Sequence, residues 1–241
     1  MKLSRTKLEL LMDCPRCFYL DLVHKIKRPS GPPFTLNLAI DTLLKAEFDV
    51  HRAQQTRHPV MEKFKINAVP YQSENMRGWR VNSKGIQFLH PKTDLLVCGA
   101  VDDIWQDLAE DATERLLHVV DYKATGAKAY NIYASYKRQM EIYMWLLIQN
   151  GFHVSPTGYF LFAKANKAEG FEGAALSFDM FIEPQAGDTS WVEEKVLLAK
   201  RVLDSNKIPD ASSECEHCEY RGSAEKLISS LREPASLVPQ G

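Results

Sequence analysis

The sequence predicts an α/β fold with a mixed central sheet flanked by helices, in the core order helix, three strands, helix, strand. Short runs rich in branched apolar residues, such as 95–105 and 116–124, are typical of buried strands. Longer segments with apolar residues at helical spacing, 34–50 and 131–149, predict the core helices. The chain is 45% hydrophobic and 25% charged, as in an ordinary globular protein. A chain of 241 residues can bury a full core, so we expect a single domain over residues 1–241.

The chain opens with a helix and a loop. Ser4 is placed to cap the helix, which carries Leu8, Leu11 and Met12 on one side. Residues 29–33, P-S-G-P-P, are a loop by composition.

The helix predicted at 34–50 has an apolar side and a partly polar row. In this row Asp41 and Lys45 are four residues apart and can form an ion pair on a solvated face. The residues expected to face the core are Leu36, Ile40, Leu43 and Leu44.

The next elements are three strands. A short strand at 85–89 precedes the strand 95–105, which ends at Asp102 and Asp103. A polar interval then returns the chain as the antiparallel neighbour 116–124.

The C-terminal half continues with the helix 131–149, two strands and a further helix. The strands are expected at 157–164 and 174–182, and the amphipathic helix at 188–203. We expect four parts in the domain: an N-terminal helical part with the first strand (1–94), a core (95–183), a C-terminal helix with a cysteine pair (188–222) and a poorly ordered tail (225–241).

Two of the predicted strands end in carboxylates. Side chains alternate along a strand, so Asp121 and Lys123 share one face and lie side by side. Leu117 and Val119 lie on this face too. Asp102 can face Asp121 across the antiparallel pair. The alternative is an exposed ion pair on a strand edge, but such pairs seldom follow a run as apolar as L-L-H-V-V.

These carboxylates predict a divalent-cation site. Asp102 and Asp121 would repel each other unless a cation lay between them, and oxygen ligands without His or Cys suit Mg²⁺ or Mn²⁺. Mg²⁺ completes its shell with water and substrate phosphate, so a phosphate group is the implied substrate. Lys123 can then stabilise the charge on pentavalent phosphorus or take a proton from the attacking water.

The helix 131–149 brings polar groups after these strands. Gln139 and Tyr143 are four residues apart and share a helix face with Tyr136. Taken alone, they fit an ordinary core-facing stripe equally well.

Four of the five cysteines form two pairs near the ends of the chain. Cys14-x-x-Cys17 and Cys215-x-x-Cys218 favour metal binding over disulfides in a cytosolic chain. Four thiolates suit either Zn²⁺ or an iron–sulfur cluster, and the spacing leaves both open. Joining the two ends would remove a loop-closure entropy on the order of 5 kcal/mol. Cys98 is expected to be a small buried hydrophobe.

Three motifs occur in order: G-x-V-D at Gly99–Asp102, D-Y-K at Asp121–Lys123, and Q-x-x-x-Y at Gln139–Tyr143. Together with C-P-R-C-F-Y-L at residues 14–20, they resemble the PD-(D/E)xK nuclease superfamily, in the RecB-like branch that includes the CRISPR-associated exonucleases with a four-cysteine iron–sulfur cluster. The resemblance implies a restriction-endonuclease-like core (αβββαβ) whose termini are joined by a Cys₄ metal centre.

The resemblance also implies a Mg²⁺- or Mn²⁺-dependent deoxyribonuclease, an exonuclease in DNA repair, recombination or CRISPR-type defence. Asp102 and Asp121 would hold the ion together with the main-chain carbonyl of Tyr122. Gln139 and Tyr143 would line the site and hold the strand. The substrate would be DNA with single-stranded regions or ends, and a helicase or CRISPR-adaptation protein is the implied kind of partner.

The sequence departs from this family at two places. The family usually has a His or an acid on the helix 34–50, where the spacing points to Asp41 as a further metal ligand; a solvated face is the alternative. The family splits its cysteines one to three between the termini, whereas here Cys17 is extra and Ser223 lies near the place of the last one. The count of four favours a [4Fe–4S] cluster, with Zn²⁺ as the alternative.

Two other functions fit the same residues. One is a catalytically degenerate nucleic-acid-binding subunit of a larger complex, and the other is a restriction-type endonuclease with a structural zinc.

Charge gives limited guidance. The net charge of −1 implies no overall basic field. Residues 1–28 hold seven Lys or Arg against three acids, which fits a solvated helix face and a phosphate track about equally well. No apolar stretch approaches the roughly 20 residues that span a bilayer, and Glu9 and Asp13 interrupt any signal peptide, so we expect a cytoplasmic protein.

Overall fold

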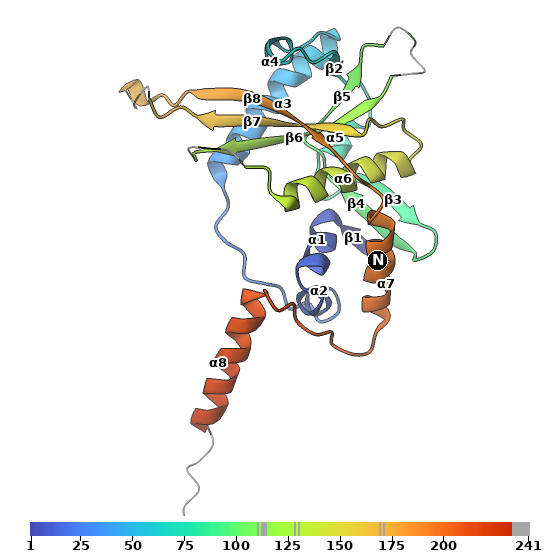
Figure 1. The fold of residues 1–241 in the computed structure, drawn as a ribbon, viewed down its shortest axis with the longest axis vertical. Helices are drawn as coiled ribbons and strands as arrows, with labels where there is room; N and C mark the ends of the chain where they lie inside the picture. The colour runs from blue at the N-terminus through green and yellow to red at the C-terminus, as the bar shows by residue number, and fades with distance from the viewer. Residues whose placement is uncertain are drawn as a thin grey trace, which may run out of the picture.

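The computed structural model describes residues 1–109, 111, 115–127, 129, 131–168, 170 and 172–232. These residues form a mixed α/β fold with two sheets, in the strand orders β1-β4-β3 and β2-β5-β6-β7-β8 (Figure 1). The strands are β1 (Lys2–Ser4), β2 (Ala68–Pro70), β3 (Ile86–His90), β4 (Leu95–Gly99), β5 (Asp103–Asp107), β6 (Leu117–Thr125), β7 (Thr157–Ala165) and β8 (Phe178–Ala186). The helices are α1 (Arg5–Asp13), α2 (Pro15–Leu22), α3 (Thr35–Gln54), α4 (Pro59–Lys63), α5 (Met76–Trp79), α6 (Ala134–Gln149), η2 (Glu172–Ala174), α7 (Val192–Asp204) and α8 (Glu216–Arg232).

Strand β6 is the centre of the five-stranded sheet. It pairs antiparallel with β5, where Asp103 lies opposite Val120, and parallel with β7. The predicted antiparallel return after the polar interval is therefore confirmed. The parallel pair needs a crossover, which α6 supplies. The mixed sheet flanked by helices confirms the fold class that the sequence predicts.

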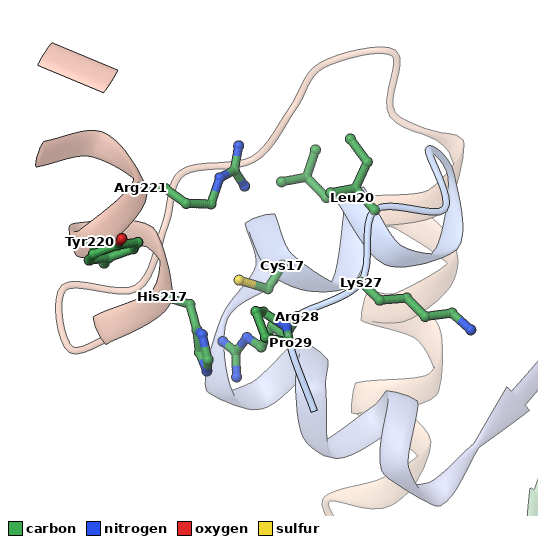
Figure 2. Close-up of a pocket in the computed structure, with 9 residues that line it drawn as sticks. Cys17, Leu20, Lys27, Arg28, Pro29, His217, Tyr220 and Arg221 are labelled. Carbon is green, nitrogen blue, oxygen red and sulfur yellow. The ribbon is translucent and has the colours of Figure 1, made fainter. Parts of the chain in front are cut away.

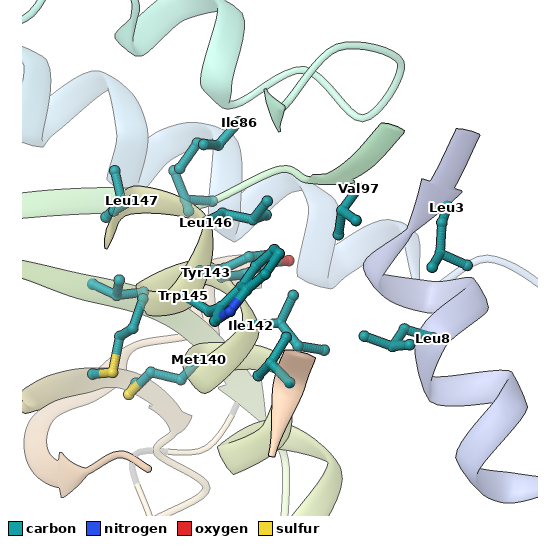
Figure 3. Packing of buried hydrophobic residues seen from close by; sticks show 14 of the residues in the cluster. Leu3, Leu8, Ile86, Val97, Met140, Ile142, Tyr143, Trp145, Leu146 and Leu147 are labelled. Carbon is teal, nitrogen blue, oxygen red and sulfur yellow. The ribbon is translucent and has the colours of Figure 1, made fainter. Parts of the chain in front are cut away.

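The alternation of β6 side chains divides the core in two. Leu117 and Val119 pack with α6, whose Met140–Leu147 face lies against Leu3 and Leu8 from the N-terminus (Figure 3). Val120 and Tyr122 belong to the second cluster, which includes Leu44 and Phe48 of α3. Helices α6 and α3 thus cover opposite faces of β6, and the predicted alternation holds.

The region 95–105 is two strands rather than one. Strand β4 belongs to the three-stranded sheet and β5 to the five-stranded sheet, so Asp102 lies in the bend between them and Asp103 begins β5. The single predicted strand ending at Asp102 and Asp103 is wrong. Both strands are buried, so hydrophobicity alone could not reveal the break.

Helix α3 is longer than predicted and turns a different face to the core. Its buried residues are Leu44, Phe48 and Arg52, whereas Leu36 is 58% exposed and Leu43 is 64% exposed. The predicted core-facing set is therefore wrong for those two leucines. The helix is apolar on two opposite sides, and periodicity could not decide which side faces the sheet.

Several boundaries shift towards the C-terminus. Strand β8 begins at Phe178 rather than at 174, and α7 begins at Val192 rather than at 188. Residues 225–232 of the expected tail continue helix α8, and 233–241 lie outside the described residues. Ser4 caps α1 as predicted, because its side chain accepts a hydrogen bond from the Lys7 N–H. Within the described part of the chain, no helix has the length and apolar character needed to cross a bilayer.

Candidate active site and cysteine centre

Asp121 lies fully buried on the middle strand, facing α6. Its Oδ1 accepts a hydrogen bond from Gln139 Nε2 at 2.7 Å, and its Oδ2 forms an ion pair with Lys123 Nζ. Because strand residues two apart share a face, the acid and the ammonium meet as the sequence predicts. Lys123 Nζ also lies 4.4 Å from the centre of the Tyr136 ring.

The Asp121 carboxylate has an ion-pair partner but an incomplete set of hydrogen bonds. Among the described residues none donates a hydrogen bond of normal geometry to its Oδ2, although Lys123 supplies charge there. Burial raises the pKa of Asp121 to about 7, and the nearby Asp102 charge raises it further, while Lys123 opposes the shift. A buried carboxylate oxygen with unused acceptor capacity fits a bound cation.

Asp102 reaches β6 from the junction between the two sheets. Its Oδ2 accepts a hydrogen bond from the Tyr122 main-chain N–H at 3.0 Å, one residue after Asp121. Its Oδ1 accepts one from Lys45 Nζ at 3.2 Å. The Asp102 carboxylate is therefore bound to the residue that follows Asp121, close enough for its charge to raise the pKa of Asp121.

Lys45 connects Asp102 to the acid on α3. Its ammonium donates to Asp41 Oδ2 at 2.7 Å as well as to Asp102, and Asp41 is half-buried. Burial acts to lower the pKa of Lys45, but the two carboxylates outweigh it and raise the pKa. Burial and the Asp102 charge also raise the pKa of Asp41. Asp41 therefore lies beside the site, paired with Lys45 as the sequence suggests, and Lys45 shields it from Asp102.

A cavity of about 240 Å³ lies beside these groups, with Asp41 of α3, Lys123 of β6 and Tyr136 of α6 in its wall. Lys45 pairs with Asp41 and Lys123 pairs with Asp121, so two ammonium groups balance the charge of these acids. In the described residues, Asp41, Asp102 and Asp121 do not bring one oxygen each to within 4.8 Å of one another. The cavity is lined by Asn37, Ile40, Asp41, Leu44, Tyr122, Lys123, Ala124 and Tyr136.

Helix α6 supplies the remaining predicted residues. Gln139 Nε2 donates to the Tyr143 hydroxyl at 3.2 Å as well as to Asp121. Burial raises the pKa of Tyr143 to about 12, assisted by the two acids. The Tyr143 ring packs on Gly99, where an added Cβ would lie 2.5 Å from Cε1. The glycine that precedes Asp102 in the motif therefore makes room for the tyrosine.

A buried ion network behind the site was missed by sequence reasoning. Asp103 is fully buried, and its Oδ1 accepts hydrogen bonds from Arg52 and, at 3.1 Å, from Arg80. Its Oδ2 accepts the Tyr122 hydroxyl at 2.7 Å. Arg80 Nε donates to the main-chain oxygen of Asp102 at 2.9 Å. Both arginines come from the region 51–80, which carries no local motif, so no signal in the sequence pointed to them.

The four paired cysteines meet at one point. Sγ–Sγ distances are 3.8 Å for Cys14–Cys218, 3.7 Å for Cys17–Cys215 and 3.5 Å for Cys17–Cys218. All four sulfurs lie within 4.8 Å of one another. These distances are too long for disulfides and fit four thiolates around a common centre. The predicted Cys₄ grouping is confirmed, and Cys98 is buried elsewhere, 2% exposed, as expected.

Local groups adjust the ionisation of these thiols. Burial acts to raise the pKa of Cys14, but hydrogen bonds from the main chain of Cys17 and Ser212 outweigh it and lower the pKa to about 7. Burial and the other thiols raise the pKa of Cys218 to about 12. Arg28 Nη2 lies 3.2 Å from Cys215 Sγ and compensates thiolate charge.

A cavity of about 140 Å³ lies beside the cysteine centre, with Cys17 and Arg28 in its wall (Figure 2). His217, Tyr220 and Arg221 of α8 form the opposite side. The N-terminal segment and the start of α8 meet at this cavity and at the cysteine centre.

The basic segment at 1–28 is partly neutralised. Each of its three acids has a basic partner, in the pairs Glu9–Arg138, Asp13–Arg28 and Asp21–Lys7. Two of its seven cations, Lys7 and Arg28, are therefore paired with acids of the same segment.

The sequence matches a known protein family, and this match guides the functional interpretation of the two sites. A sequence profile described as the PD-(D/E)XK nuclease superfamily matches residues 35–223. The chain belongs to the PD-(D/E)XK nuclease superfamily. Membership supports a metal-dependent nuclease activity and, through it, a nucleic-acid substrate. The cysteine grouping is consistent with the RecB-like branch of the PD-(D/E)XK nucleases.

Other comparisons add little. The solved structure of SSO0001 aligns at 13% identity over 98% of this chain and 87% of that chain, with a TM-score of 0.34. A score this low transfers no residue role to this PD-(D/E)XK nuclease. No curated protein matches the sequence significantly.

Proposed function

We propose that the chain is a Mg²⁺- or Mn²⁺-dependent DNA nuclease with its active site at Asp102, Asp121 and Lys123. The observation that carries this proposal is the Asp121 carboxylate, which is fully buried, has a pKa raised to about 7 by burial and lacks a hydrogen bond at Oδ2 among the described residues. Lys123 is the ammonium that faces this buried acid, and a bound cation would stabilise the carboxylate further. The family match supports the same chemistry.

Each residue at the site can have a separate role in the reaction. Asp102 and Asp121 would hold the ion, together with the main-chain carbonyl of Tyr122, while Asp41 approaches from α3. The bound ion would supply an activated water and neutralise charge at the phosphate. Lys123 would stabilise that charge or accept the proton of the attacking water at Nζ. Gln139 fixes the Asp121 carboxylate by a 2.7 Å hydrogen bond, and Tyr143 fixes Gln139.

The finer activity rests on the resemblance to the RecB-like nucleases. We infer exonuclease action on DNA that has single-stranded regions or ends, carried by residues 1–241 acting as one nuclease domain. A role in repair, recombination or CRISPR-type defence, with a helicase or adaptation partner, is the biological setting that fits this activity.

The test uses end-labelled linear DNA with Mn²⁺ or Mg²⁺. Lys123→Ala should abolish cleavage while DNA binding, measured by anisotropy in Ca²⁺, persists. Lys137→Ala is the matched control, because Lys137 is exposed on the same α6 that carries Gln139, and it should cleave like the wild type. Wild-type protein that binds DNA without cutting it in either metal contradicts the proposal.

One observation favours a non-catalytic alternative. Lys45 bonds both Asp41 and Asp102, which leaves an ammonium where a third metal ligand would be needed. A degenerate binding subunit would bind DNA but bind Mn²⁺ weakly, and titration calorimetry with Mn²⁺ separates the two. A restriction-type endonuclease would instead nick covalently closed circles, which an exonuclease leaves intact.

We propose that Cys14, Cys17, Cys215 and Cys218 hold one structural metal centre. A tetrahedral Zn²⁺ with bonds of about 2.3 Å sets its sulfurs about 3.8 Å apart, close to the observed separations of 3.5 to 3.8 Å. A [4Fe–4S] cube would need to spread the sulfurs further, so the geometry favours zinc and the resemblance favours the cluster. Elemental analysis and the visible absorption spectrum of anaerobically purified protein decide between them.

A further inference from the structure

Helix α3 has an apolar face that the rest of the described chain leaves uncovered. Leu36, Leu43 and Val50 recur every seven residues and are 58%, 64% and 56% exposed. At 100° per residue they point away from Leu44 and Phe48, which pack on the sheet. One apolar side is enough for a helix to cover a sheet, so the second apolar side of α3 is available to pack against another helix.

Six exposed apolar residues of α3 follow a heptad pattern, and Leu38, which is 60% exposed, lies outside it. They alternate in steps of three and four residues over the whole helix, with a large residue at one position and alanine at the other. Such spacing is the pattern by which one helix pairs with another in a coiled-coil seam. The outer seam of α3 consists of Leu36, Ala39, Leu43, Ala46, Val50 and Ala53.

Helix α8 of the same chain cannot supply the partner. It too has exposed apolar residues, such as Leu227 and Leu231, and it projects away from the body (Figure 1). Its first turn carries Cys218, whose sulfur lies 3.5 Å from that of Cys17. The first turn of α8 is therefore held at the cysteine centre, and the rest of the helix points away from α3 (Figure 1).

The outer seam is complementary to itself when it runs antiparallel. About the midpoint between residues 43 and 46, each large side chain falls opposite an alanine. Alternating large and small residues let two helices approach closely without voids. The facing pairs are Leu36 with Ala53, Ala39 with Val50, and Leu43 with Ala46.

A parallel pair of α3 helices would pack less well than the antiparallel pair. It would set Leu43 against Leu43 and Ala46 against Ala46, which leaves gaps at every alanine layer. It would also bring Glu47, whose side chain is 63% exposed, close to its own copy. The antiparallel register places Glu47 near Ile40 of the other helix instead, so like charges do not meet.

We propose that two copies of this chain dock through the outer seam of α3, paired antiparallel about a two-fold axis. Asp41 and Lys45 point to the active-site side of α3, so the docked seam leaves the cavity open. A single helix pair is smaller than the roughly 1,200–2,000 Å² of a standard interface, so we expect a micromolar dimer. This docking does not depend on the proposed nuclease activity.

The first test is the molar mass in solution by sedimentation velocity, from about 1 to 200 μM protein. Wild type should shift from monomer to dimer, and Leu43→Glu should stay monomeric at every concentration. Leu227→Glu on α8 is the matched control, since Leu227 is 61% exposed and should leave the dimer intact. A wild type that stays monomeric, or a dimer lost in Leu227→Glu and kept in Leu43→Glu, overturns the proposal.

The second test examines the register. Ala39→Glu and Val50→Lys should each weaken the dimer at least tenfold, because each buries a charge in the seam. The double variant should regain dimerisation, since Glu at 39 faces Lys at 50 twice in the antiparallel pair. In a parallel pair the same charges would meet their own copies, so a double variant as weak as the singles rules out this register. Circular dichroism should show unchanged helix content throughout.

Discussion

The ion network behind the site allows a sharp test of stability. Asp103 is fully buried and bonds Arg52, Arg80 and the Tyr122 hydroxyl. Asp103→Asn keeps the shape but removes the charge that compensates two largely buried guanidinium groups, whose side chains are 9% and 11% exposed. Breaking a buried ion pair by removing one partner costs about 3–5 kcal/mol. For a protein of this size that corresponds to a fall in Tm of about 6–20 °C.

The assay is urea denaturation in EDTA, followed by circular dichroism. Asp49→Asn is the matched control, because Asp49 bonds the same two arginines but its side chain is 51% exposed, so it should cost only about 0–1 kcal/mol. A loss of under about 1 kcal/mol in Asp103→Asn, equal to that of the control, would refute the reasoning. A triple variant with Asp103, Arg52 and Arg80 replaced by apolar residues of similar size should regain much of the lost stability.

Three further outcomes are expected. Gly99→Ala would set a Cβ 2.5 Å from the Tyr143 ring and should cost about 1–3 kcal/mol, while Gly78→Ala, which meets nothing within 4 Å, should not destabilise the protein in the same melt. Cys218→Ser should lower the metal content in elemental analysis and the Tm together, unlike Cys98→Ser. In EDTA, Asp121 should make stability fall as pH rises from about 4 to about 7, because the unfolded acid loses its proton near 3.8 and the buried one only near 7. Asp121→Asn should remove this slope in urea melts, and exposed Asp179→Asn should keep it.

Local patterns predicted the parts of the site that lie on one element. The period of two along β6 placed Asp121 beside Lys123, and the helical spacing placed Gln139 beside Tyr143. The two C-x-x-C pairs predicted their own meeting, since four soft ligands favour one centre. Each of these inferences needed only a periodicity or a ligand preference.

Long-range partners were not predictable in this way. Arg52 and Arg80 lie 51 and 23 residues before Asp103, and neither belongs to a motif. Their pairing depends on how α3 and α5 pack, which no local pattern encodes. The outward face of α3 was misassigned for a related reason: two apolar sides satisfy the same period, and only the sheet decides which is buried.

The break between β4 and β5 explains why Asp102 can reach the site. An acid inside a continuous strand would have its main chain committed to the ladder, but at the bend the Asp102 carbonyl is free to accept Arg80 Nε. On its other side, the Tyr122 N–H holds the carboxylate, while the Tyr122 hydroxyl reaches Asp103 through the sheet. The two faces of β6 therefore have different roles. The face with Asp121 and Lys123 would carry the proposed chemistry, and the main chain and hydroxyl of Tyr122 hold Asp102 and Asp103. The Asp103→Asn substitution should consequently reduce the affinity of the site for divalent metal ions, while the Asp121–Lys123 ion pair stays intact.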